Sequence, residues 1–261
     1  MTPRVTADYH MHSLHSGDGH EPVSAFCEAA VERGLSAIGF CEHLDFEETD
    51  LCYGVFDYDA YSRAIDEARA AFAGRLLIHK GVEFSYEPHH EGVIGRYLAS
   101  HEFDYSVISI HFLGHAFIDG EYCVWRGAEA LWAEYFEAVR LSAESGLGDL
   151  VGHIGLPARY WGATWASLAG ASYREGAESA LRAAAAAGRV IECNTSSLRT
   201  GLPDPMPTPG LLAMFAELGG RVVALGSDAH YAADVGASLS SVAETAVRCG
   251  LSLWAGPGGL S

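Results

Sequence analysis

The feature that most constrains the fold of this chain is a repeated alternation of two kinds of segment. Short runs of β-branched and apolar residues are typical of buried strands, and the longer Ala-rich runs between them are typical of helices. The predicted strands are 5–10, 36–41, 76–83, 105–110, 149–153, 189–194 and 221–226. The predicted helices are 23–33, 58–72, 127–145, 172–187, 209–218 and 233–249, most of them ending directly before a glycine.

This alternation predicts an α/β fold with a parallel sheet, and seven strand units favour a closed or nearly closed barrel. A doubly wound open sheet is the alternative. The length of 261 residues suits one domain, and no linker composition interrupts it. We therefore expect a single domain over residues 1–261, with a core of about 5–250 and a loose end at 251–261.

The charge balance excludes several classes of partner. Sixteen basic against 34 acidic side chains give a net charge of −18, and Lys80 is the single lysine. A phosphate-binding loop needs a lysine after its glycines, and nucleic acids or anionic lipids need clustered cations. The chain also lacks a signal-peptide pattern and any apolar run of about 20 residues. The six cysteines are not closely paired, so we expect reduced thiols in a cytoplasmic protein that does not bind membranes or nucleic acid.

Potential metal ligands lie at the carboxyl ends of the predicted strands. His10 and His12 at the end of the first strand share one face, because side chains alternate along a strand. The other candidates at or just after strand ends are Asp18, His43, Glu83, His111, His153, Asp228 and His230. Each alone could be a core histidine, a turn aspartate or a helix cap. In a barrel, however, all these ends meet at one mouth, and nine nitrogen and oxygen ligands suit a cluster of two or three metals.

Other polar residues have weaker patterns. Arg159 and Arg199 follow predicted strands, where a guanidinium could clamp a phosphate or simply be solvated. The acidic run 45–48 is interpreted as a solvated face, with contact to a cation as the alternative. The remaining histidines are expected on the surface or in loops, although His15 and His20 flank Asp18. The segment 111–126 is long for a loop and could cover a substrate.

The ordered motifs resemble the polymerase-and-histidinol-phosphatase (PHP) superfamily from about residue 7 to residue 236. The motifs that carry this resemblance are His10-x-His12, Asp18, Glu42-His43, Gly81-x-Glu83, Ser109-x-His111, Gly152-His153 and Ser227-Asp228-Ala229-His230. Within the superfamily, the Asp18-Gly19 loop and the segment from Asn194 to Arg199 are most similar to histidinol-phosphatases of the PHP type. That resemblance implies a distorted (β/α)7 barrel and the hydrolysis of L-histidinol phosphate, a step of histidine biosynthesis.

The resemblance also implies three metal ions, which could be Zn, Fe or Mn. His10, His12, Glu83 and Asp228 would hold the first ion. Glu83 would bridge to a second ion, completed by His111 and His153. Asp18, His43 and His230 would hold the third ion.

The resemblance further assigns residues to the substrate, a small phosphate ester. Arg159 and Arg199 would hold its phosphate, and we expect Asn194 and His15 to border it. Three divalent ions contribute about +6, which outweighs the ligand carboxylates and attracts a phosphate dianion to an acidic protein. The hypothesis is attack by a metal-bridged hydroxide, with Asp18, His43 or a metal-bound water giving the leaving group its proton. No feature of the sequence indicates an oligomeric state.

Four alternatives remain open at this point. Another PHP phosphoesterase would act on a different small ester or nucleotide. A metal-dependent amide hydrolase would need a carboxylated lysine, but Lys80 is expected to point away from Glu83. The charge and the lack of an attached domain disfavour a polymerase-linked exonuclease. A non-catalytic metal-binding domain would be free to lose some of the nine ligands, and none is missing.

Overall fold

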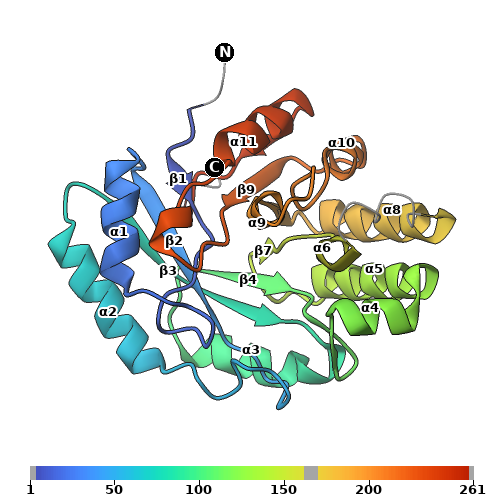
Figure 1. The fold of residues 1–261 in the computed structure, drawn as a ribbon, viewed down its shortest axis with the longest axis horizontal. Helices are drawn as coiled ribbons and strands as arrows, with labels where there is room; N and C mark the ends of the chain where they lie inside the picture. The colour runs from blue at the N-terminus through green and yellow to red at the C-terminus, as the bar shows by residue number, and fades with distance from the viewer. Residues whose placement is uncertain (1–3, 162–169, 259–261) are drawn as a thin grey trace.

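The computed structural model describes residues 4–161 and 170–258 as a curled parallel sheet with helices around its outside (Figure 1). The order of the strands in the sheet follows their order in the chain. They are β1 (Ala7–Asp8), β2 (Ala37–His43), β3 (Leu77–Ser85), β4 (Tyr105–Ser109), β7 (Leu150–Val151), β8 (Val190–Asn194), β9 (Val222–Gly226) and β10 (Ser252–Leu253). A small antiparallel hairpin, β5 (Phe112–Leu113) and β6 (Ala116–Phe117), follows β4.

Helices connect successive strands and cover the outer face of the sheet (Figure 1). They are α1 (Val23–Glu32), α2 (Tyr58–Ala71), α3 (Glu91–Ser100), α4 (Gly120–Arg126), α5 (Ala128–Glu144), α6 (Ala158–Trp161), α8 (Ala171–Ala186), α9 (Ser196–Arg199), α10 (Pro209–Glu217) and α11 (Leu239–Arg248), with 3-10 turns η1 (Pro88–His90) and η3 (Ala232–Asp234). In α11, the buried residues Leu239, Val242, Ala243 and Ala246 follow the spacing of one helical face. That stripe explains why the helix lies against the sheet. None of the helices in the described ranges has both the length and the apolar character needed to cross a bilayer.

The sheet curls until its first strand meets β9, which confirms the predicted distorted barrel in a single domain. The backbone N–H of Tyr9 donates to the Leu225 carbonyl at 2.9 Å, and the N–H of Asp228 donates to the His10 carbonyl at 2.8 Å. These hydrogen bonds connect β1 to β9 and close the ring of strands. The carboxyl ends of β1 and β9 therefore lie side by side.

The floor of the barrel is packed with large side chains. The Tyr105 hydroxyl donates to the Tyr9 carbonyl at 2.7 Å and lies 3.0 Å from the Cys41 sulfur. Gly81 makes room for this ring, because a Cβ at that position would lie 2.6 Å from Tyr105 Cζ. The glycine two residues before Glu83 thus has a packing function beneath the site.

Several elements differ from the predicted ones. The stretch 251–258 is not loose, because β10 pairs with β9 and the Trp254 ring packs 4.8 Å from Tyr9. Residues 259–261 of that predicted end lie outside the described ranges. Helices α3 and α4 were not predicted, and the helix predicted at 233–249 starts only at Leu239. Ser238, which precedes it, has the left-handed backbone conformation (φ 59°), which interrupts a helix.

Candidate metal centre

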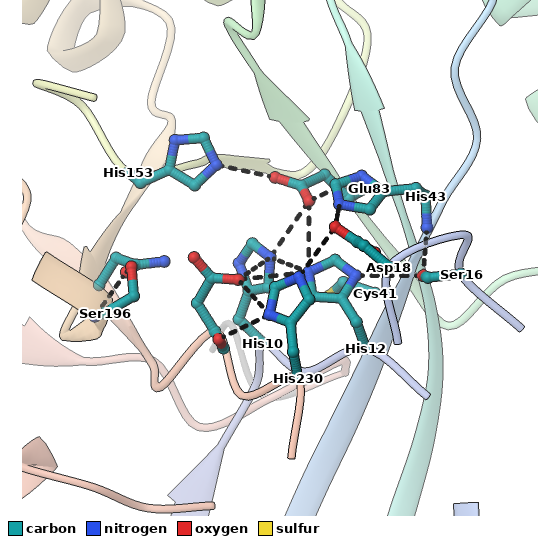
Figure 2. A network of polar contacts seen from close by, with 12 residues as sticks. His10, His12, Ser16, Asp18, Cys41, His43, Glu83, His153, Ser196 and His230 are labelled. Atoms are coloured by element: carbon teal, nitrogen blue, oxygen red, sulfur yellow. Dashed lines mark hydrogen bonds and ion pairs between the residues drawn. The ribbon is translucent and has the colours of Figure 1, made fainter. Parts of the chain in front are cut away.

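The nine predicted ligands meet at the carboxyl ends of the strands, and Figure 2 labels most of them: His10, His12, Asp18, His43, Glu83, His153 and His230. Side chains alternate along the strand, and Met11 packs in the outer apolar layer with Phe26 and Phe40. Its neighbours His10 and His12 therefore both point inwards. His43 ends β2 and Glu83 lies in β3. The remaining ligands come from the connections that follow β1, β4, β7 and β9: Asp18, His111, His153, Asp228 and His230.

Glu83 lies at the centre of the first group of ligands. Its Oε2 atom is 3.3 Å from His10 Nε2 and 3.5 Å from His12 Nε2. Asp228 Oδ1 lies 3.4 Å from His12 Nε2 and 3.9 Å from His10 Nε2. All four side chains are buried. They form a compact set of two imidazoles and two carboxylates.

The other oxygen of Glu83 belongs to a second group. Glu83 Oε1 lies 3.0 Å from His153 Nε2 and 3.6 Å from His111 Nε2. It also accepts a hydrogen bond from the Ser109 hydroxyl at 2.5 Å. One carboxylate therefore faces two groups of imidazoles, one with each oxygen (Figure 2).

Asp18 forms a third group with two histidines. Asp18 Oδ2 lies 3.1 Å from His230 Nε2 and 3.5 Å from His43 Nε2. The His12 ring is stacked against both histidines, with centroid distances of 4.3 Å to His43 and 4.5 Å to His230. The third group thus adjoins the first.

Burial and neighbouring charges favour neutral His12 and His111 rings beside an ionised Glu83, whereas at His10 and His43 the neighbouring carboxylates raise the pKa against the effect of burial. Burial lowers the pKa of His12 to about 3, and its imidazole neighbours add to this effect. Burial also lowers the pKa of His111 to about 3, although Glu83 opposes it. Burial alone would raise the pKa of Glu83, but His10 and His111 hold it well below its usual range. Neutral imidazole and carboxylate are the forms that bind transition metals.

The geometry of the ring nitrogens fits metal ions. His10 Nε2 faces His12 Nε2 at 3.0 Å, and His111 Nε2 faces His153 Nε2 at 3.2 Å. Two such nitrogens repel one another unless a proton or a cation lies nearby. Asp18 Oδ1 is buried and accepts no hydrogen bond from the described residues. The donor set of imidazoles and carboxylates suits Zn, Fe or Mn.

Glu192 positions two of the ligands and was missed by the sequence analysis. Its Oε1 atom accepts from His10 Nδ1 at 2.7 Å, and Oε2 accepts from the backbone N–H of His153 at 2.8 Å. The first contact turns Nε2 of His10 towards the centre. Gly226 leaves space for this carboxylate, since a Cβ there would lie 2.0 Å from Glu192 Oε1. The sequence does contain one signal for Glu192, which is a carboxylate in the middle of an otherwise apolar strand.

Glu42, which precedes His43, organises the first loop rather than facing the ligands. It accepts hydrogen bonds from the Ser13 hydroxyl at 2.6 Å and the Ser16 hydroxyl at 2.7 Å. The Ser16 oxygen also accepts from the backbone N–H of His43 at 2.9 Å. The loop that carries Asp18 is thereby fixed to β2.

A cavity of about 270 Å³ opens above the ligands. Most of the ligands line it: Asp18, His43, Glu83, His111, His153, Asp228 and His230. The other lining residues include Asp45, Asp50, Leu51, Phe117, Arg159 and Tyr160. Arg159 comes from α6 and Phe117 from the β5–β6 hairpin. The hairpin therefore borders the cavity, as expected for the 111–126 segment.

Arg199 lies beside the site instead of lining the cavity. Its Nη1 donates to the Ser227 carbonyl at 2.7 Å, and its Nη2 donates to the Asp228 carbonyl at 2.9 Å. Each of these nitrogens keeps a second N–H. Asp228 has the left-handed backbone conformation (φ 54°), which is unfavourable for a non-glycine residue, so these bonds help to hold a strained ligand.

The structure does not bring Asn194 or His15 to the cavity. The Asn194 amide is fully buried, donating to Glu192 and accepting from Ser196. The His15 ring packs 5.6 Å from the Tyr61 ring of α2. Both side chains serve the scaffold, and the expectation that they border the substrate has no support in this geometry.

Lys80 is also placed away from the ligands. Its Nζ donates to the Tyr58 hydroxyl at 3.1 Å and to the Ser62 hydroxyl at 3.2 Å, both on α2. The carboxylated-lysine alternative therefore has no lysine at the centre.

Comparison with known proteins agrees with this architecture. The chain belongs to the PHP domain family, whose model matches residues 8–196. A probable histidinol-phosphatase of Deinococcus radiodurans is 29% identical over 244 residues, which is 88% of each chain. The histidinol-phosphatase of Lactococcus lactis subsp. lactis is 29% identical over 228 residues, covering 86% of this chain and 84% of the relative.

Solved structures show the same fold. The histidinol phosphate phosphatase of Lactococcus lactis, crystallised with Zn, L-histidinol and phosphate, matches with a TM-score of 0.82 at 25% identity over 97% of both chains. A putative histidinol phosphatase from Listeria monocytogenes matches with a TM-score of 0.79 at 22% identity, over 90% of this chain and 99% of the other.

Proposed function

We propose that this chain is a metal-dependent phosphomonoesterase that hydrolyses L-histidinol phosphate to L-histidinol and phosphate. The observation that carries the proposal is the convergence of nine buried or partly buried ligands beneath one cavity bordered by an arginine. The Lactococcus lactis relative, which binds Zn, L-histidinol and phosphate, supports both the reaction and the substrate.

The three groups of ligands would hold three divalent ions, with Zn as the first candidate. His10, His12, Glu83 and Asp228 would hold one ion, and Glu83, His111 and His153 a second. Asp18, His43 and His230 would hold the third. When bound, such ions lower the pKa of water and neutralise phosphate oxygens.

The walls of the cavity suit the two ends of the substrate. Arg159 would bind the phosphate through a bidentate guanidinium contact. Asp45 and Asp50 also line the cavity and would attract the ammonium and imidazole of the histidinol part. Phe117 and Leu51 offer apolar surface to the substrate chain.

We assign Asp18 and His43 as the candidate groups that give the leaving oxygen its proton. Both line the cavity, and Asp18 Oδ2 lies 3.5 Å from His43 Nε2. Asp18 Oδ1 is buried and accepts no hydrogen bond from the described residues. His43 is the better proton source of the two: burial lowers its pKa, but its contacts with Asp18, Glu83 and Asp45 raise it to about 10. Burial raises the pKa of Asp18, but its contacts with His230 and His43 hold it well below the usual range.

A panel of phosphate esters tests the proposal. We expect the zinc-loaded protein to release phosphate from L-histidinol phosphate with a kcat/KM at least about 10-fold above those for glycerol phosphate and nucleoside monophosphates, since the acidic wall selects a cationic substrate. A higher kcat/KM for another ester would favour a different PHP phosphoesterase. Full metal loading without phosphate release would favour a non-catalytic metal-binding domain.

Replacing Arg199 with alanine tests the second arginine. We propose that its free Nη hydrogens contact phosphate, so Arg199→Ala should lower kcat/KM by about 10²-fold with metal content unchanged. Arg199→Lys, which keeps the charge but loses the fork, should recover only part of the activity. Steady-state kinetics and elemental analysis are the two measurements. Loss of metal together with activity would instead assign Arg199 to holding the Asp228 segment.

A further inference from the structure

A second group of imidazoles and carboxylates lies beside the mouth of the barrel, outside the nine ligands. We call it the loop cluster, and it consists of Glu47, Glu87, His89, His90 and His115. Glu47 follows β2, Glu87 to His90 follow β3, and His115 forms the turn between β5 and β6. The acidic run 45–48 was predicted to be a solvated face, which is wrong for Asp45 and Glu47, because both side chains are buried, as is that of Glu87.

The donor atoms of the loop cluster are close enough to share one cation. Glu87 Oε2 lies 3.3 Å from His89 Nε2 and 3.4 Å from His90 Nδ1. Glu47 Oε2 lies 2.9 Å from His115 Nδ1 and 3.8 Å from His89 Nε2. One donor atom from each of Glu47, Glu87, His89 and His90 lies within 4.8 Å of all the others. This spacing is compatible with a single coordination sphere.

The Glu87 carboxylate lacks the partners that a buried charge requires. Glu87 is only 2% exposed, and neither oxygen accepts a hydrogen bond from any residue in the described ranges. Burial and the nearby Glu47 carboxylate together raise its pKa to about 8. Within the described residues, its ion-pair neighbours are the two histidines that point at it. A buried carboxylate in this position needs a proton or a cation.

We propose that the loop cluster binds an additional divalent transition-metal ion, with Zn²⁺ as the natural candidate. A mixed set of imidazoles and carboxylates favours Zn²⁺ over Mg²⁺ or Ca²⁺, which prefer all-oxygen sites. The four side chains within reach of one ion come from the loops after β2 and β3, and His115 joins the β5–β6 turn to them through its contact with Glu47. These three loops are far apart in sequence. Two of them also carry residues of the cavity wall, Asp45 beside Glu47 and Phe117 beside His115. The site therefore stabilises the wall of the cavity without lining it.

A shared proton between Glu47 and Glu87 is the competing explanation. In that case the histidines would serve as ion-pair partners, and no metal would be retained. The two explanations differ in metal content, which does not depend on phosphatase activity. A failure of the proposed reaction would appear as absent phosphate release and leaves this measurement unaffected.

Metal analysis of four proteins tests the inference. The full-length wild type, Glu87→Gln, His90→Gln and the exposed control Glu48→Gln are stripped with chelator, reloaded with excess Zn²⁺, desalted and analysed by mass spectrometry of the elements. We expect Glu87→Gln and His90→Gln to retain about one ion fewer per chain than wild type and Glu48→Gln. Reloading with Co²⁺ should show the loss of one set of visible absorption bands in the same two variants.

Equal zinc content in all four proteins would overturn the inference and favour the shared proton. His90→Gln keeps both carboxylates, so it tests the site even where Glu87→Gln does not fold. Circular dichroism of each reloaded protein verifies folding. A normal zinc content in a folded His90→Gln and a reduced content in Glu48→Gln would each contradict the proposal as well.

Discussion

Glutamine in place of Glu83 should lower kcat/KM for L-histidinol phosphate by about 10³-fold or more, which corresponds to about 4 kcal/mol of transition-state stabilisation. Glu83 Oε2 faces His10 and His12, and Oε1 faces His153 and His111. The amide removes the negative charge and turns an NH2 group towards one of the two imidazole sets. Both metal groups should therefore be weakened by one substitution.

Steady-state kinetics and metal content of Glu83→Gln provide the measurement, with Glu48→Gln as the matched control. Glu48 is exposed and its substitution makes the same change of charge at a distance from the ligands. Zinc content should fall in Glu83→Gln and stay at the wild-type level in the control. A Glu83→Gln enzyme with normal turnover would remove the shared carboxylate from the mechanism.

The sequence predicts the ligand set well because the rule that places ligands is simple. Parallel strands bring their carboxyl ends to one edge, and alternation fixes the face, so His10 and His12 can be assigned without knowledge of packing. The same rule places His43, His111 and His153. Periodicity and glycine stops likewise predict the seven strands of the ring, although their ends shift by one or more residues.

The supporting residues could not be predicted in this way, because their roles depend on long-range contacts. Glu192 reaches His10 across 182 positions in the chain, and its one local signal, a carboxylate in an apolar strand, does not show which ligand it contacts. The loop cluster is similar: Glu47 and His115 lie in segments whose composition is typical of surface loops. Only the fold of these connections onto one another buries Glu47 and Glu87, with His115 exposed beside them.

Short elements also escape prediction for a physical reason. The two-residue strand β10 has too few residues to show a period, and its place is fixed by Trp254 packing under Tyr9. Helix α4 is capped by Asp119, the residue before Gly120, whose side chain accepts from the backbone N–H of Tyr122. Neither element contributes a ligand, so the site prediction survives these errors.

Removal of the metal ions should abolish activity and also lower the unfolding temperature by about 10 °C or more. An ion present at about 1,000 times its Kd stabilises the folded state by about 4 kcal/mol, and a protein of this size gains about 2–4 °C per kcal/mol. Without the ions, buried donors such as His10 and His12 face one another at 3.0 Å. The folded state then carries the cost of desolvating these ring nitrogens and can relieve their repulsion only by taking up a proton.

Thermal unfolding with and without chelator, followed by stepwise addition of Zn²⁺, measures both effects. The unfolding temperature and phosphate release should recover together with Zn²⁺, whereas Mg²⁺ should restore neither, because imidazole-rich sites bind it poorly. Glu83→Gln should show a smaller chelator-induced shift than the wild type, since two of its sites are already weakened. If the unfolding temperature does not change when chelator is added, the converging side chains are held by their own hydrogen bonds, and the proposed metal centre is wrong.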